Sequence, residues 1–522
     1  MDGSTSHDLK NSIDLDRFRL RTFIESLRGS DQLDIREDNI DLADMAAIMQ
    51  GNPKAVWFKK AGPDNVEVVG NVVGGRERLA RALGIPRAEI VTELQRRLKL
   101  PPQLVEITRD EAPVQQVVIT GDDIDVLKLP AHLQHAFDGA PYISATVDFT
   151  IDPATGLSNC GIRRLMLRGP KETGVDLNAP SDLRAIYMAA QARGEKVPVA
   201  YVIGMHPIDL VAATMKQPGD ELALISSLRA APMAVVKCVT QPVMVPADSE
   251  IILEGYLDPA GYTEKEGPYG EYLGYYGGVK RNPVFHITAI THRKDALFQT
   301  ATISGNRMDL TDTSNLEALR TELNAWEALK SVVREPIAVY APVSAGGSMS
   351  IRFSLKQRYP GEARSALHTV LGSTSAKHAF AVDPDIDIFN DQQFEWAFGT
   401  RFQVDKDLIQ ATAVRLSPLD PSLHGAHTGA KAGFDLTWPM QFANKWELQI
   451  PAPPRYPGKK FASLKAALED GPKRFEELMA ATGSRDGREI VREMFGMTGI
   501  ERDDRGARRR ITRTGGTATA TR

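Results

Sequence analysis

The segment ISATVDFTIDPATG (residues 143–156) joins an apolar run rich in β-branched residues to a run of turn-forming residues. Ile, Val, Thr and Phe favour strands, whereas Asp, Pro and Gly favour turns. The same texture recurs from about residue 113 to residue 310, in the runs VPVAYVIG, SEIILEGYL and VFHITAITH. Short strands separated by turns predict a largely antiparallel, barrel-like β domain. Helical patterns near residues 181–193 and 219–229 interrupt it.

The sequences on either side of this β region have a different periodicity. Residues 1–112 alternate helical runs such as RERLARALGI with strand-like runs such as AVWFKK, which predicts a mixed α/β domain. Residues 315–450 alternate in the same way and predict a second α/β domain with parallel strand pairing. Residues 451–522 hold a Pro-rich linker, PAPPRYPG, then helices over 460–495 and a basic tail that we expect to be disordered. The expected fold class is therefore mixed α/β around a central β-barrel domain of residues 113–314.

Composition narrows the class of protein. The chain has 522 residues, 42% of them hydrophobic, and a formal net charge of −4, which gives no electrostatic reason to expect nucleic acid or an anionic membrane as partner. Two cysteines exclude a disulfide scaffold and are typical of a reducing compartment. The polar N-terminus lacks the apolar region of a signal peptide, and no apolar run reaches the length of a membrane span. We therefore expect a cytoplasmic globular protein without a membrane partner.

The stretch EGPYGEYLGYYGG (residues 266–278) places two carboxylates, Glu266 and Glu271, on a glycine-rich backbone. Glycine clusters mark tight turns or the close approach of a ligand. The stretch is therefore either a loop with two solvated acids or part of a site that uses both acids.

A second polar cluster, SNCGIRRLMLRG, carries Asn159, Arg163 and Arg164 on a predicted strand. The two arginines should face opposite ways, so that only one lines a given pocket. Asp220 and Glu221 begin a predicted helix, where acids also stabilise the helix N-terminus.

Two short histidine pairs have a spacing that suits metal ligation, but neither has further ligands nearby in the sequence. They are His132 with His135, in HLQH, and His424 with His427, in HGAH. Short pairs of this kind are a weak signal, and we favour structural roles for them.

Taken together and in order, these motifs resemble those of the UbiD-like decarboxylases, which use a prenylated flavin. The resemblance runs from about residue 16 to residue 440. The segments that carry it are LKLPAHLQHAFDGAPYI, SNCGIRRL, VPADSEIILEGYL, EGPYGEYLGYYGG, RFSLKQRYPGEARSAL, KHAFAVDPDIDIFN and GAKAGFDLTWP. It implies an N-terminal α/β part, a flavin-reductase-like split β-barrel that binds the flavin, and a C-terminal α/β domain.

The resemblance also implies a catalytic group of one arginine and two acids. By the family spacing these are Arg164, which lies five residues after Asn159, and the pair Glu266 and Glu271. Breaking a carbon–carboxylate bond leaves a carbanion, which needs an electron sink that amino-acid side chains do not provide. Arg164 would orient the carboxylate and pair with Glu266, and Glu271 would return a proton to carbon.

The cofactor implied by the resemblance is prenylated FMN (prenylated flavin mononucleotide), held through a divalent metal and a nearby K⁺. The implied flavin-binding residues are Asn159, Cys160, Ile162, Arg163, Arg164, Glu221 and Lys377. The implied metal ligands are Asn159, Asp182 and Glu221. Asp182 is a departure, because the family usually has His where Asp182 falls when residues are counted from Arg164 without a gap. Oxygen ligands suit Mn²⁺ or Mg²⁺, so the alternatives are an altered metal preference, a shifted ligand or a weakened cofactor site.

The implied reaction is the reversible, non-oxidative decarboxylation of an aromatic or heteroaromatic acid, or of an aryl-CoA thioester. The implied partners are a flavin prenyltransferase as cofactor supplier and further copies of this chain in a homodimer or homohexamer. Residues that we expect near the substrate are His427, Phe434 and Trp438. The alternatives are an ordinary flavin oxidoreductase, which would leave the arginine and two acids unexplained, and a non-catalytic scaffold relative.

Overall fold

The computed structural model describes residues 12–216, 218–426, 428–440, 450–503 and 507–510. The chain forms two compact units, Met1–Trp438 and Pro439–Arg522. None of the helices in the described ranges combines enough length and apolarity to cross a membrane.

The centre of the first unit is a closed antiparallel barrel of six strands, confirming the predicted β domain. Neighbours around the ring are hydrogen-bonded, and the last strand pairs back to the first through Leu253 and Ile290. The strands in ring order are β12 (Ile251–Leu257), β9 (Val197–Ile203), β6 (Tyr142–Ile151), β7 (Ser158–Gly169), β8 (Glu172–Val175) and β17 (Val284–His292). The segment that predicted this domain forms β6 and the turn into β7.

Shorter elements surround the barrel. The strand β5 (Val117–Thr120) pairs with β17. A separate three-stranded sheet is formed by β10 (Met233–Lys237), which pairs with β4 (Leu104–Glu106) and β11 (Met244–Pro246). The two predicted interrupting helices are α6 (Asp182–Gln191) and α8 (Glu221–Arg229), and a further short helix, α7 (Pro207–Ala212), packs on α8. The glycine-rich stretch lies in two small hairpins, which pair β13 (Glu264–Glu266) with β16 (Lys280–Asn282) and β14 (Tyr269–Gly270) with β15 (Tyr276–Gly277).

A buried cluster of ion pairs connects α7 and α8 to the segment that precedes β12. Arg229 is 2% exposed and donates to both carboxylate oxygens of Asp209, at 2.7 and 2.6 Å. It also donates to both oxygens of Asp248, at 2.6 and 3.1 Å. Buried charges persist only when they are paired in this way.

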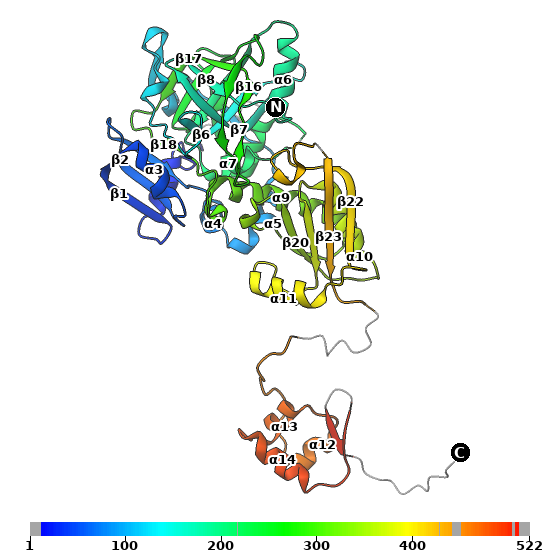
Figure 1. Ribbon diagram of the computed structural model, residues 1–522. Coiled ribbons are helices and arrows are strands. Elements are labelled where there is room, and N and C mark those ends of the chain that lie inside the picture. The colour runs from blue at the N-terminus through cyan, green and yellow to red at the C-terminus, as the bar shows by residue number, and fades with distance from the viewer. Residues whose placement is uncertain (1–11, 217, 427, 441–449, 504–506, 511–522) are drawn as a thin grey trace, which may run out of the picture. The chain divides into compact units, whose positions relative to one another are not determined.

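The N-terminal part is a mixed sheet with helices, as its alternating pattern predicts. Its strands are β1 (Leu33–Ile40), β2 (Ala55–Ala61) and β3 (Val66–Gly70), and β18 (Phe298–Gln299), which follows the barrel in sequence, joins β3 in parallel. Its helices are α2 (Leu20–Ser26), α3 (Leu42–Met49), α4 (Arg76–Leu83) and α5 (Ile90–Arg97). Figure 1 shows this part in blue beside the barrel.

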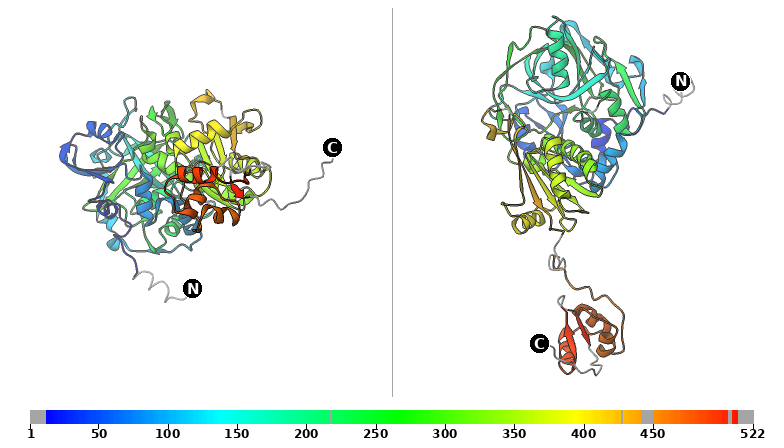
Figure 2. Two further views of the ribbon diagram at one scale, coloured as in Figure 1. Left: turned by 90° about the horizontal axis from the view of Figure 1, so that it is seen from below. Right: turned by 90° about the vertical axis from the view of Figure 1, so that its right-hand side faces the viewer.

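The C-terminal part of the first unit is a five-stranded sheet in the order β19 (Pro336–Tyr340), β20 (Ser350–Leu355), β21 (His378–Val382), β23 (Thr428–Leu436) and β22 (Leu408–Arg415). The three central strands are parallel, as predicted, and both edge strands are antiparallel. The helices are α9 (Asp312–Val332), α10 (Glu362–Ser373) and α11 (Asp391–Arg401). In Figure 2 these elements, yellow-green to orange, lie against the cyan and green barrel.

In its described residues, the second unit contains three helices followed by a two-stranded hairpin. These are α12 (Leu464–Glu469), α13 (Phe475–Thr482), α14 (Gly487–Phe495), β24 (Ile500–Arg502) and β25 (Arg508–Arg510). Its apolar residues pack on one another around Leu464, Leu468, Leu478 and Ile490. Part of the basic segment that we expected to be disordered thus forms β25, and residues 511–522 lie outside the described residues.

Candidate active site

A cavity of about 280 Å³ brings most of the predicted site residues together. The predicted residues that line it are Asn159, Cys160, Ile162, Arg163, Arg164, Asp182, Glu221 and Glu271. Thr313, Leu316 and Glu317 of α9 close it from the C-terminal part of the unit. Residues more than 150 positions apart in the sequence therefore share one cavity.

The strand β7 forms a wall of this cavity, and one expectation about it is wrong. Arg163 and Arg164 do take different partners, since Arg163 pairs with Asp148 of β6 at 3.1 Å and Arg164 pairs with the two predicted acids. Both arginines nevertheless line the cavity, as do all residues from 159 to 164. Because the strand lies along the wall, its backbone as well as its side chains borders the cavity.

The guanidinium of Arg164 is held from two sides by the predicted acids. Its Nε donates to Oε1 of Glu266 at 3.0 Å, and its Nη2 lies 3.2 Å from Oε1 of Glu271. Glu266 is 1% exposed and is not among the residues that line the cavity, whereas Glu271 lines it. Burial raises the pKa of Glu271, although the nearby charge of Arg164 opposes this rise. Glu271 is therefore the acid suited to exchange a proton with a molecule in the cavity.

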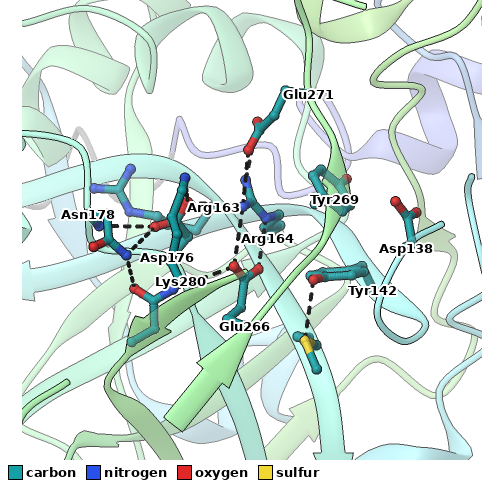
Figure 3. Close-up of polar contacts among 12 residues, drawn as sticks. Asp138, Tyr142, Arg163, Arg164, Asp176, Asn178, Glu266, Tyr269, Glu271 and Lys280 are labelled. Carbon is teal, nitrogen blue, oxygen red and sulfur yellow. Dashed lines mark hydrogen bonds and ion pairs between the residues drawn. The ribbon is translucent and has the colours of Figure 1, made fainter. Parts of the chain in front are cut away.

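A third carboxylate, which none of the sequence motifs contains, also binds Arg164. Oδ2 of Asp176 accepts from Nη2 of Arg164 at 2.9 Å and from Nζ of Lys280 at 3.2 Å. The pairing of Leu165 with Val175 between β7 and β8 brings Asp176 opposite Arg164. Figure 3 shows Glu266, Glu271 and Asp176 converging on Arg164.

Tyr269 supports the arginine from its face. The Arg164 guanidinium carbon lies 4.3 Å from the centroid of the Tyr269 ring, within the range of a cation–π contact. The Tyr269 hydroxyl donates to Oε1 of Gln134 at 2.7 Å, which fixes the ring. A Cβ at Gly277 would lie 2.8 Å from Oε1 of Glu271, so the glycine makes room for that carboxylate.

The predicted metal ligands border another part of the same cavity. Oε2 of Glu221 accepts from the Asn159 side-chain amide at 2.7 Å and from the Cys160 backbone N–H at 2.6 Å. Burial raises the pKa of Glu221 to about 7, and the nearby Asp182 also raises it, against the opposing hydrogen bond from Cys160. An acid crowded by another carboxylate is the kind of group that a bound cation would relieve.

Asp182 is the first residue of α6, and its side chain is 60% exposed. The nearest cation, Nζ of Lys216, lies 3.9 Å away and also borders the cavity. Oxygen atoms from Asn159, Asp182 and Glu221 form a donor set that suits a hard cation such as Mn²⁺ or Mg²⁺, with Lys216 beside it for an anionic group. The chemistry of these residues is therefore compatible with a divalent cation and an anionic group beside it.

Lys377 is not among the described residues that line the cavity. Its Nζ donates to Oδ2 of Asp420 at 2.8 Å and to the Ser422 hydroxyl at 2.6 Å. Phe434 also does not line it, because its ring stacks on Phe380, with centroids 4.5 Å apart, in the aromatic core of the C-terminal sheet.

The other described residues that the sequence points to do not line this cavity. The backbone N–H of Trp438 donates to Asp383 at 2.7 Å, outside the residues that line the cavity. His132 is buried, which lowers its pKa to about 4, and His135 lies 3.1 Å from Asp138. His424 is exposed, and His427 lies outside the described residues.

Family models match nearly all of the first unit. They are the N-terminal, Rift-related and C-terminal domains of 3-octaprenyl-4-hydroxybenzoate carboxy-lyase (UbiD), at residues 24–98, 105–307 and 314–436. The chain is also 30% identical, over 80% of its length and 95% of the relative's, to an anhydromevalonate phosphate decarboxylase of Methanosarcina mazei.

Two solved structures of one enzyme share the fold. The UbiD-class enzyme HmfF from Pelotomaculum thermopropionicum, in complex with FMN, matches with a TM-score of 0.78 and 31% identity over 84% of this chain and 98% of that chain. An evolved dimeric form of HmfF in complex with prFMN (prenylated FMN) matches with a TM-score of 0.75 and 30% identity, again over 84% and 98% of the two chains.

Proposed function

Because the chain belongs to the UbiD family of carboxy-lyases, we propose that it decarboxylates an aromatic or heteroaromatic acid, or an aryl-CoA thioester, with prenylated FMN bound in the cavity. The observation that carries the proposal is the arrangement of Arg164 between Glu266, outside the cavity lining, and Glu271, within it. A flavin oxidoreductase would have no use for a buried acid of raised pKa paired to a substrate-facing arginine.

The cofactor would be held by the residues that face the cavity from β7, α6 and α8. Asn159, Asp182 and Glu221 would ligate Mn²⁺ or Mg²⁺ beside the flavin phosphate, with K⁺ nearby, and Lys216 would add positive charge. When bound, prenylated FMN supplies the electron sink that carbon–carboxylate cleavage requires. A flavin prenyltransferase would have to supply it.

Arg164 would orient the substrate carboxylate. Four hydrogen bonds to three carboxylates use four of its five N–H groups, and the fifth, on Nη1, would be left for the substrate. Tyr269 and Glu266 fix the guanidinium, so this hydrogen has a defined direction. Glu271 would then deliver its proton to the carbon from which carbon dioxide has left.

Each part of the chain would have its own role in this reaction. Residues 113–314 would bind the flavin, with residues 1–112 beside them, and residues 315–450 would shape the substrate side of the cavity through α9. Residues 451–522 would serve assembly of a homodimer or homohexamer.

A second substrate class deserves the same test, because the Methanosarcina mazei relative is named for anhydromevalonate phosphate, which is not aromatic. The chain should be produced together with a flavin prenyltransferase and assayed for carbon dioxide release. The panel should hold benzoic, cinnamic and furoic acids, one aryl-CoA acid and anhydromevalonate phosphate. Turnover of an aromatic member supports the proposal, and turnover of anhydromevalonate phosphate alone replaces it with the second class. Full activity with ordinary FMN would contradict the cofactor assignment.

A further inference from the structure

Asp176 and Lys280 form an ion pair beside the proposed catalytic residues. Their side chains are 13% and 32% exposed, and the distance between Oδ2 of Asp176 and Nζ of Lys280 is 3.2 Å. Asp176 follows β8, and Lys280 is the cross-strand partner of Glu266 in the pairing of β13 with β16. Both residues therefore reach the Arg164 cluster from elements that also carry its other members.

Asparagines hold this pair in place. Asn178 donates to Oδ1 of Asp176 from its backbone at 3.0 Å and from its side chain at 3.2 Å. The Asn178 amide also donates to Oδ1 of Asn282 at 2.7 Å, and Asn282 donates to Glu266 at 3.5 Å. Figure 3 shows this connection running from Asn178 through Asp176 to Arg164. The position of Asp176 is thus fixed by hydrogen bonds at Oδ1, while Oδ2 binds the two cations.

The cluster holds one negative charge too many when every group is ionised. Its cations are Arg164 and Lys280, and its carboxylates are Asp176, Glu266 and Glu271. One added proton makes the set neutral. Asp176 binds both cations. Glu266 accepts from Nε of Arg164 at 3.0 Å and also from Asn282, whereas the contacts of Glu271 to Arg164 are 3.2 and 3.4 Å long, so Asp176 and Glu266 have the better partners for the ionised form. The proton therefore belongs on Glu271.

We propose that Asp176 and Lys280 are a matched pair of positioning residues, which set how firmly Glu271 holds its proton. Asp176 partly neutralises Arg164 and Lys280, whose positive charges would otherwise favour the ionised form of Glu271. Lys280 acts in the opposite direction, because its positive charge favours that ionised form. The proposal rests on the proposed function only in the use that Glu271 makes of this proton.

The electrostatics of the individual groups agree with this assignment. Burial alone raises the pKa of Asp176, but Arg164 and then Lys280 bring it down to about 2. Burial also raises the pKa of Glu271; Arg164 and Lys280 lower it, while Asp176 and Glu266 raise it further. Across the cavity, Glu317 of α9 faces the same space but is paired with Arg320 of its own helix.

Substitutions of Asp176 and Lys280 should shift the pH midpoint of Glu271 protonation in opposite directions. A merely structural role of the two residues would not produce opposite shifts. Asp176→Asn removes a negative charge and should lower the midpoint of Glu271 protonation by about one pH unit, because a neighbouring charge typically shifts a carboxyl by one to three. Lys280→Gln removes a positive charge and should raise the midpoint by a similar amount. The double variant should return it close to the wild-type value.

The midpoint can be measured in the protein without flavin, so the experiment does not depend on turnover. The protonated-carboxyl band of Glu271 is identified in the infrared spectrum as the band that Glu271→Gln removes, and it is followed against pH. The controls are Glu264→Gln and Lys265→Gln, which change exposed residues of β13, the strand that carries Glu266. They should leave the midpoint unchanged. Circular dichroism establishes that each variant is folded.

Shifts of opposite sign confirm the proposal. Shifts of the same sign in both variants, or none in either, overturn it. If Asp176→Asn does not fold, Asp176→Glu, which keeps the charge, and Lys280→Gln still decide the matter: the former should keep the midpoint and the latter should raise it. Failure of the substrate panel with these shifts intact would overturn the proposed function and leave the charge pair standing.

Discussion

Arg164 meets Glu266 at two points, with Nε 3.0 Å from Oε1 and Nη2 3.4 Å from Oε2. Two parallel contacts fix the plane of a guanidinium as well as its position. Glu266 is buried and is not among the residues that line the cavity, so the role we propose for it is to orient Arg164. The two acids of the glycine-rich stretch would then have separate functions.

Glu266→Gln should weaken catalysis by misplacing Arg164. The amide replaces one of the two accepting oxygens with a donating NH₂ group, so it cannot reproduce both parallel hydrogen bonds. A misplacement of about 1 Å can cost about 10²-fold in rate, and we expect a loss of that size in kcat/KM with a raised KM. Steady-state kinetics of the flavin-loaded enzyme measure both. An unchanged KM would show that Arg164 does not bind the substrate carboxylate.

Glu271→Gln should abolish proton delivery while leaving the cofactor site intact. Loss of a positioned general acid costs about 10²–10⁴-fold, and transfer of solvent deuterium to the product should fall in parallel. Flavin and metal content should stay at wild-type levels, as in the exposed control Glu264→Gln. A variant that retains more than about a tenth of the wild-type rate would assign the proton to another group.

The raised pKa of Glu271 also predicts the pH dependence of the rate. Because the acid must be protonated to act, the rate should be highest below its pKa and fall as the pH rises through that value. Rate–pH profiles of the wild type and of Glu271→Gln test this. The residual activity of the variant should lack the descending limb, and its persistence would contradict the assignment.

Asp182→Ala should lower bound metal and bound flavin together, because Asp182 would supply one of the oxygens that hold the metal against the phosphate. Metal analysis and flavin absorbance of the purified protein measure both. Glu195→Ala, an exposed acid just beyond the same helix, is the matched control. Unchanged contents in the Asp182 variant would show that another residue completes the metal site.

Arg229→Ala should destabilise the first unit without touching the cavity. Removing one partner of a buried ion pair leaves an uncompensated charge and typically costs about 3–5 kcal/mol. Both Asp209 and Asp248 would lose the guanidinium that they bind, which places the expected loss at the upper end. Urea unfolding measures it. Arg193→Ala, which breaks an exposed pair with Glu195, should leave the urea midpoint close to that of the wild type.

Much of the barrel was predictable, because its strands are short runs rich in apolar and β-branched residues that end in recognisable turns. The segments predicted at residues 143–151 and 284–292 form β6 and β17 within one residue of the expected bounds. The meeting of Arg164 with Glu266 and Glu271 also followed from motif spacing by resemblance to the family.

Asp176 and Lys280 were not predictable from local sequence. Their proximity depends on the register of β7 with β8 and of β13 with β16, and register across an irregular hairpin is a tertiary property. The only local signal is the Asp176–Asn178 turn, which is common in loops. Phe434 was misplaced for a similar reason, since an aromatic residue on a strand suits a pocket and a core equally well.

The helices of the second unit bury their apolar faces on one another. The residues of that core all lie between 464 and 490, and the remaining cores are built from residues before 439. Two compact units whose cores share no residue should melt as two calorimetric events. Enthalpy scales with the number of ordered residues, so the event of the small unit should be a minor one. A chain ending at Trp438 should lose that minor peak and keep the midpoint of the major one.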